Sequence, residues 1–218
     1  MQNGLVTGWV LFCLLAGFVP NLHAATIRVS VSDDKGTPVK DAVVYAEFKD
    51  GNYPSPPKNM TAKMDQQNKE FIPYVLPVQV GTSVTFPNSD NIRHHVYSFS
   101  PAKKFELPLY KGKPANPVVF DKPGVVALGC NIHDWMIAYV YVVDTPFFAK
   151  TWDNGKGNLS DLPAGLYEIR VWHPRMKNAS EITVKQLRIQ KNEEIEYKIE
   201  LKPEWRLHRP PPSGTGRY

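Results

Sequence analysis

The chain contains few cysteines: only Cys13 and Cys130 occur among its 218 residues. Cys13 lies in an apolar run at 5–19, which small residues follow up to Ala24. This run is too short to span a bilayer and has the layout of an export signal, so we expect residues 1–24 to be a cleaved signal peptide. An uncleaved anchor is the alternative, because no basic residue precedes the run. The mature chain would keep one thiol, which excludes an internal disulfide framework and indicates a thiol that reacts or binds something.

The chain also lacks any block of charge of one sign. Its 26 Lys and Arg are scattered among 21 Asp and Glu, giving a net charge of +5. No basic stripe or known module supports nucleic-acid binding. No later stretch is long and apolar enough to be a membrane span, so we expect none in the mature chain. Residues 204–218 are basic and rich in Pro and Gly, which predicts a disordered tail.

Helix signals are scarce, whereas β-branched and aromatic residues alternate between frequent Pro and Gly. This pattern predicts an all-β fold of the sandwich or barrel type. Turns are indicated by the sequences DDKGTP, VGT, DKPG, DNGKG and LPAG. The expected strands lie at 26–32, 41–48, 71–80, 82–88, 94–100, 116–121, 124–130, 136–144, 167–174, 182–189 and 194–201.

So many strands exceed what one small barrel needs, which favours two modules. Residues 52–63 form a Pro-rich connector, and 64–145 form one continuous alternating block that contains every candidate ligand. The outer pieces, 25–52 and 146–203, carry VSDDKGTPVKDAVVYAEF and TWDNGKGNLSDLPAGLY. These sequences resemble the two halves of a carboxypeptidase-regulatory-like β-sandwich. We therefore expect the central block to be inserted into that sandwich, since exposed loops tolerate insertion; a single enlarged sandwich is the alternative.

One short segment of the central block, GCNIHDWM at 129–136, gathers Cys130, His133 and Met136. Strand-like runs lie on both sides of it, which favours a turn between two strands over a helix. A turn can direct all three side chains to one point, whereas an alternating strand would send Cys130 and His133 to opposite faces. The thiol, the imidazole and the thioether are all ligands for transition metals.

A further ligand must come from another part of the chain. Beyond the expected signal peptide, the histidines are His94, His95, His133, His173 and His208. The last two lie in the outer module and the tail, so His94 or His95 is the candidate. One thiolate, two imidazoles and a thioether favour copper. Structural zinc sites depend on several cysteines, and iron–sulfur clusters need more thiols than this chain has.

Residues 64–144 resemble a cupredoxin, a member of the plastocyanin, pseudoazurin and amicyanin group of blue-copper proteins. The likeness rests on the run FIPYVLPVQVGTSVTFPNSD, on PGVVALGCNIHDWM and on the amicyanin-like C-x-x-H-x-x-M spacing. It implies one copper ion held by His94, Cys130, His133 and Met136. In plastocyanins the first ligand follows the strand Phe by eight positions, which points from Phe86 to His94. His95 would then take the place of the residue, commonly Asn, that ties the ligand loops together, and it is also the alternative ligand.

The resemblance implies a carrier of single electrons between unidentified redox proteins and no enzymatic activity. The whole chain also resembles periplasmic proteins labelled methylamine-utilisation proteins, so we expect a periplasmic location. Ile132 and Trp135 would form an apolar docking patch, although Trp135 could instead pack beneath its loop. A copper-storage or scaffold protein is the alternative function. A copper oxidase would need further histidines, and a Cys130–His133 nucleophilic pair would need an exposed thiol.

Overall fold

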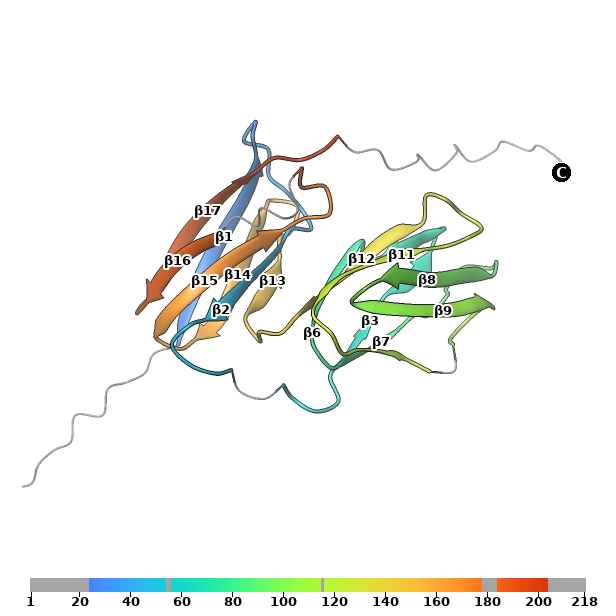
Figure 1. The fold of residues 1–218 in the computed structure, drawn as a ribbon. Helices are drawn as coiled ribbons and strands as arrows, with labels where there is room; N and C mark the ends of the chain where they lie inside the picture. The colour runs from blue at the N-terminus through green and yellow to red at the C-terminus, as the bar shows by residue number, and fades with distance from the viewer. Residues whose placement is uncertain (1–23, 54–55, 115, 178–183, 204–218) are drawn as a thin grey trace, which may run out of the picture.

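The computed structural model describes residues 24–53, 56–114, 116–177 and 184–203 (Figure 1). These residues form strands, turns and irregular segments, which confirms the predicted all-β class. In the part of the chain that the structure describes, no helix is long and apolar enough to cross a membrane. Residues 1–23 of the expected signal peptide and the expected tail at 204–218 lie outside the described residues.

One lobe of the molecule is a sandwich of two sheets built from both outer parts of the chain (Figure 1). The first sheet has the order β14–β1–β17, with β1 antiparallel to β14 and parallel to β17. The second sheet has the order β13–β2–β15–β16. The strands are β1 (Ala25–Asp33), β2 (Val43–Phe48), β13 (Phe148–Lys150), β14 (Lys156–Leu162), β15 (Gly165–Trp172), β16 (Val184–Ile189) and β17 (Glu193–Ile199). Alternate apolar residues such as Ile27, Leu159 and Ile169 fill the space between the sheets.

The other lobe is built from the central part of the chain. A five-stranded sheet of order β6–β12–β11–β8–β9 and a three-stranded sheet of order β10–β7–β3 enclose a separate core, and β4 pairs with β5 as a hairpin. The strands are β3 (Thr61–Lys63), β4 (Asp65–Gln67), β5 (Glu70–Ile72), β6 (Val75–Gln79), β7 (Thr82–Thr85), β8 (His94–Ser100), β9 (Lys103–Tyr110), β10 (Val118–Phe120), β11 (Gly124–Gly129) and β12 (Ile137–Val143). Phe86, Phe105 and Phe120 pack their rings together in this core.

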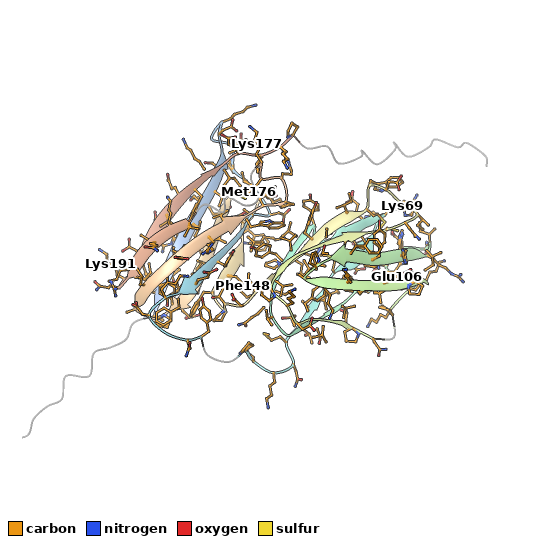
Figure 2. All side chains as sticks on the ribbon, in the orientation of Figure 1. Lys69, Glu106, Phe148, Met176, Lys177 and Lys191 are labelled. Carbon is orange, nitrogen blue, oxygen red and sulfur yellow. The ribbon has the colours of Figure 1, made fainter. Side chains whose placement is uncertain are left out.

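An aromatic cluster joins the two lobes. Trp172 at the end of β15 packs against Tyr141 of β12, with 4.7 Å between ring centroids. Tyr45 of β2 lies 5.6 Å from the Tyr141 ring, and the two hydroxyl groups are hydrogen-bonded at 3.1 Å. Figure 2 shows Phe148, which also packs against this cluster, where the lobes meet. The buried faces of two neighbouring sheets therefore form an apolar junction.

Several strand boundaries differ from the sequence-based prediction. The single strand expected at 71–80 is divided at residues 73–74 into β5, which pairs with β4, and β6, which pairs with β12. The expected connector at 52–63 contains β3, which pairs with β7 of the central lobe. Strands β4, β9, β13 and β14 were not predicted. β9 carries lysines and Pro108 and lies at a sheet edge, where proline is tolerated.

Thr151 links two turns of the outer sandwich through its buried hydroxyl. Its Oγ1 accepts a hydrogen bond from the Ala42 N–H at 2.9 Å and donates one to the Val39 carbonyl at 2.7 Å. Thr151→Val should lower the free energy of unfolding by about 1–3 kcal/mol for each group left unpaired. Chemical denaturation would measure the loss. The matched change at the exposed Thr61, Thr61→Val, should stay within about 0.5 kcal/mol; equal losses in both variants would contradict this role.

Candidate metal centre

Two loops of the central lobe carry the residues that the sequence singles out. The first loop, residues 86–93, joins β7 to β8, so that His94 is the first residue of β8. The second loop, residues 130–136, joins β11 to β12. Strands β8 and β11 are neighbours in the sheet, and Gly129 pairs with Tyr97. This pairing holds the start of the second loop beside the strand that carries His94.

The side chains of His94, Cys130 and His133 converge on one point. The Cys130 Sγ atom and one ring nitrogen of each histidine all lie within 4.8 Å of one another. The two imidazole centroids are 5.0 Å apart. His94 and Cys130 are only 0% and 3% exposed, and His133 is half-buried. A thiolate and two imidazoles at this separation can hold a transition-metal ion.

The unpaired nitrogens of the cluster support a metal site. The Nδ1 atoms of His94 and His133 are buried and have no hydrogen-bond partner among the described residues. An unpaired buried polar atom costs about 1–3 kcal/mol. A metal ion bound to both lone pairs would remove that cost. Nδ1 of His95, outside the cluster, is unpaired as well, so the convergence of the three donor side chains is what fits a metal ion.

Met136, the fourth predicted ligand, closes the second loop. Its backbone N–H donates to the His133 carbonyl at 2.9 Å, which turns the chain back toward β12. The side chain is 1% exposed and belongs to the same core cluster as Cys130. It is thus buried in the core of the central lobe, and its role as an axial ligand stays a prediction.

His95, the alternative ligand, is not part of the convergent cluster. His94 and His95 are successive residues of β8, and the pairing of β8 with β9 shifts register between His94 and Val96, so their contacts, and not strand alternation, distinguish the two side chains. The His95 Nε2 atom lies 2.8 Å from Glu106 Oε1 on β9, and its ring packs 5.5 Å from the Tyr97 ring. The hydrogen bond described for His95 therefore joins two neighbouring strands of the sheet, β8 and β9.

The β4–β5 turn links the two ligand loops instead. The Asn68 and Lys69 N–H groups donate to the two carboxylate oxygens of Asp90 in the first loop, at 2.7 and 2.8 Å. The Lys69 carbonyl accepts a hydrogen bond from Trp135 Nε1 in the second loop, at 3.1 Å. Sequence reasoning missed this link. A signal was present in Asn68, since asparagine favours the left-handed conformation of two-residue hairpin turns, and both turn residues have positive φ, 56° and 59°.

Asn88 and Tyr110 fix the first loop internally. The Asn88 amide donates to the carbonyls of Ile92 and Tyr110, at 2.9 and 2.7 Å. The Tyr110 hydroxyl donates to the Phe86 carbonyl and accepts from the Gln66 amide. Burial raises the pKa of Tyr110 to about 12, so this phenol stays protonated as a donor. The loop before His94 is therefore held at both ends by partly buried hydrogen bonds.

The surroundings of the cluster shift the pKa values of two side chains, His133 and Asp90. Burial lowers the pKa of His133, and the positive charge of Lys69 lowers it further, which favours the neutral imidazole that binds metals. Burial alone would raise the pKa of Asp90. Hydrogen bonds from the Lys69 N–H, the His94 ring and the Asn68 N–H outweigh that effect and hold the pKa of this carboxyl below its usual value.

The two residues expected to form a docking patch occupy different environments. Ile132 at the tip of the second loop is 46% exposed. Trp135 is half-buried, packs against the core of the central lobe, and lies with its ring 5.0 Å from the His133 ring. Its indole N–H is bonded to the β4–β5 turn. Trp135 thus supports the loop from beneath, and participation of Ile132 in docking stays a prediction.

No family model matches this chain, and no curated protein matches it. Several solved structures are similar to part of it. A purple cupredoxin from Nitrosopumilus maritimus is 26% identical, with a TM-score of 0.34, over 38% of this chain and 99% of its own. A reduced mutant of amicyanin is 21% identical, with a TM-score of 0.35, over 45% of this chain and 99% of its own. A Cu-containing nitrite reductase from Thermus scotoductus SA-01 is 23% identical, with a TM-score of 0.36, over 53% of this chain and 28% of its own.

Proposed function

We propose that this protein binds one copper ion through His94, Cys130, His133 and Met136 and carries single electrons between redox partners. The observation that carries the proposal is the convergence of one thiol and two imidazole nitrogens within 4.8 Å, with both Nδ1 atoms buried and unpaired among the described residues. When bound, copper supplies a one-electron couple between Cu(I) and Cu(II). A set of four protein ligands leaves no position for a substrate, which favours electron transfer over catalysis.

Each residue has a distinct task in this proposal. Cys130 supplies a thiolate from a buried position, where water is excluded from the sulfur. His94 is fully buried and holds the inner side of the site. His133 is the more exposed imidazole, so it is the residue through which an electron would reach a partner. The short hydrogen-bonded loop keeps these groups in place whichever charge the site carries, which limits reorganisation during transfer.

The cellular context is part of the same proposal. The apolar run at 5–19 and the small residues up to Ala24 support export to the periplasm. The partners would be periplasmic redox proteins that dock near the second loop, where Ile132 is exposed. The outer sandwich holds no residue of the His94–Cys130–His133 cluster, so it would act in attachment or contacts while the central lobe carries the electron.

The experiment is optical titration of the purified full chain with Cu(II). We expect one equivalent to produce the intense visible absorption of a thiolate–Cu(II) bond. Ascorbate should bleach this absorption and ferricyanide should restore it, over repeated cycles without loss of the Cys130 thiol. Stoichiometric binding without reversible cycling would support the alternative, a copper-storage or scaffold protein. Absence of copper binding would overturn both proposals.

A further inference from the structure

The carboxylate of Asp90 contacts the buried His94 imidazole at the ring nitrogen Nε2. Asp90 Oδ2 lies 2.7 Å from His94 Nε2, and the Asp90 side chain is only 15% exposed. The other ring nitrogen, Nδ1, is buried, has no partner among the described residues, and belongs to the histidine that converges with Cys130 and His133. The imidazole therefore lies between a carboxylate on one side and the candidate metal position on the other.

This contact determines which ring nitrogen carries the proton. An ionised carboxylate only accepts hydrogen bonds, so His94 must donate from Nε2 to Asp90. In the neutral imidazole, a proton on Nε2 leaves the lone pair on Nδ1. That lone pair is the one available to the convergent cluster. A negative charge behind the ring also makes the imidazole a stronger electron donor toward a bound cation.

The position of the carboxylate is itself fixed by the backbone. The N–H groups of Asn68 and Lys69 each hold one Asp90 oxygen, at 2.7 and 2.8 Å. Two successive residues at positive φ, 56° and 59°, direct both N–H groups toward the anion. The Asp90 N–H also donates to Asn88 Oδ1 at 3.0 Å. The carboxylate therefore has little freedom to leave His94.

The same turn supports the second loop on its other side. The Lys69 carbonyl accepts from Trp135 Nε1 at 3.1 Å, and the Trp135 ring packs beside His133. Figure 2 shows Lys69 in the lobe that carries the ligands, well away from Phe148 at the junction of the lobes. One two-residue turn thus connects Asp90 in the first loop, which contacts His94, with Trp135 in the second loop, which packs beside His133.

We propose that Asp90, held by the β4–β5 turn, is a positioning residue that fixes His94 for coordination through Nδ1 and lowers the reduction potential of the bound metal. The inference rests on the proposed function, because it concerns the same site. The negative charge of Asp90 stabilises the divalent state more than the monovalent state, since the attraction grows with the charge of the ion. The copper centre is consequently harder to reduce than it would be with a neutral group behind His94.

The test compares Asp90→Asn with the matched control Glu106→Gln. The control removes the other carboxylate–histidine contact of β8, at His95, which lies outside the cluster. Nitrogen NMR of the metal-free proteins would report the His94 tautomer. Chelator competition would report the Cu(II) and Cu(I) affinities, and redox titration the potential. Circular dichroism would confirm that each variant is folded.

In the wild type and in Glu106→Gln we expect the proton on Nε2 of His94 and equal potentials. Asp90→Asn should lose about 10–100-fold in Cu(II) affinity, the usual effect of removing a group that orients a ligand, and less in Cu(I) affinity. A tenfold difference between the two losses raises the potential by about 59 mV. Asp90→Glu keeps the charge, so it should retain the tautomer and recover part of the potential even if Asp90→Asn folds poorly.

An unchanged tautomer and potential in folded Asp90→Asn would overturn the inference, and so would equal shifts in Glu106→Gln. If Asp90→Asn does not fold, failure of Asp90→Glu to keep the Nε2–H tautomer would also overturn it. The tautomer is measured without metal, so it remains decisive if the wild type fails to cycle copper. Failure of the proposed function is thereby distinguished from failure of the role given to Asp90.

Discussion

Cys130→Ala is expected to abolish the visible absorption of the copper-loaded protein. The thiolate is the only sulfur anion that the convergent cluster contains, and no other described residue can supply one, because Cys130 is the free cysteine of that part of the chain. Copper affinity should fall by more than the roughly 10–100-fold seen when only a supporting group is removed. Optical spectra and chelator competition on the full chain would measure both effects.

The change at Cys130 should leave the fold intact. Alanine removes one buried sulfur from the core of the central lobe, which we expect to lower the free energy of unfolding by about 0.5–3 kcal/mol. His95→Gln is the matched control, since it alters a histidine adjacent to His94 that faces Glu106 instead of the cluster. That variant should keep the absorption. A band that survives in Cys130→Ala, or disappears in His95→Gln, would refute the assignment of the ligands.

Trp172→Ala is expected to cause the largest loss of stability among single changes at the junction of the lobes. Trp172 is 4% exposed and packs against Tyr141 and Tyr139, at 4.7 and 5.8 Å between centroids. Replacing a buried tryptophan by alanine typically costs about 3–5 kcal/mol. Because each lobe has its own core, the variant should also unfold in two separate steps. Urea denaturation followed by fluorescence and circular dichroism would reveal both results.

The matched control is Trp152, the other tryptophan that the structure describes in the outer lobe. Trp152 lies in a turn and is 70% exposed. Trp152→Ala should therefore change the free energy of unfolding by no more than about 0.5 kcal/mol. If Trp172→Ala were no more destabilising than Trp152→Ala, the aromatic cluster would not be the contact that holds the lobes together.

The sequence predicted strands well where both apolar alternation and β-branched residues were present. β12 reads IAYVYVV and β15 reads GLYEIRVW, and both were expected. β14 reads KGNLSDL, in which only Gly157, Leu159 and Leu162 are buried. With so few apolar residues, the sequence shows no clear alternation of apolar and polar positions. Its strand conformation depends on pairing with β1, which lies more than a hundred residues earlier in the chain. Such pairing supplies hydrogen bonds that no local pattern records.

The candidate site was predictable to a similar extent. The spacing of residue types predicted His94, Cys130 and His133 as metal ligands. The structure brings these three side chains together. The groups that support them were not predictable in the same way. Asp90 and Trp135 are both hydrogen-bonded to the main chain of Lys69; Asn68 indicates a turn there, but no residue type indicates which remote side chains its N–H and carbonyl groups bind. The place given to His95 was assigned by analogy, and its described hydrogen-bond partner is Glu106 on the neighbouring strand β9.

The sequence by itself determined the all-β class and the set of side chains able to bind a metal, because alternation and ligand chemistry are properties of residue types and their local order. Only the tertiary structure decided that Asp90 contacts the buried His94 ring, that His95 pairs with Glu106, and how two distant outer segments share their sheets. These outcomes depend on strand pairing and on backbone hydrogen bonds between remote residues, whose geometry exists only once the chain has folded.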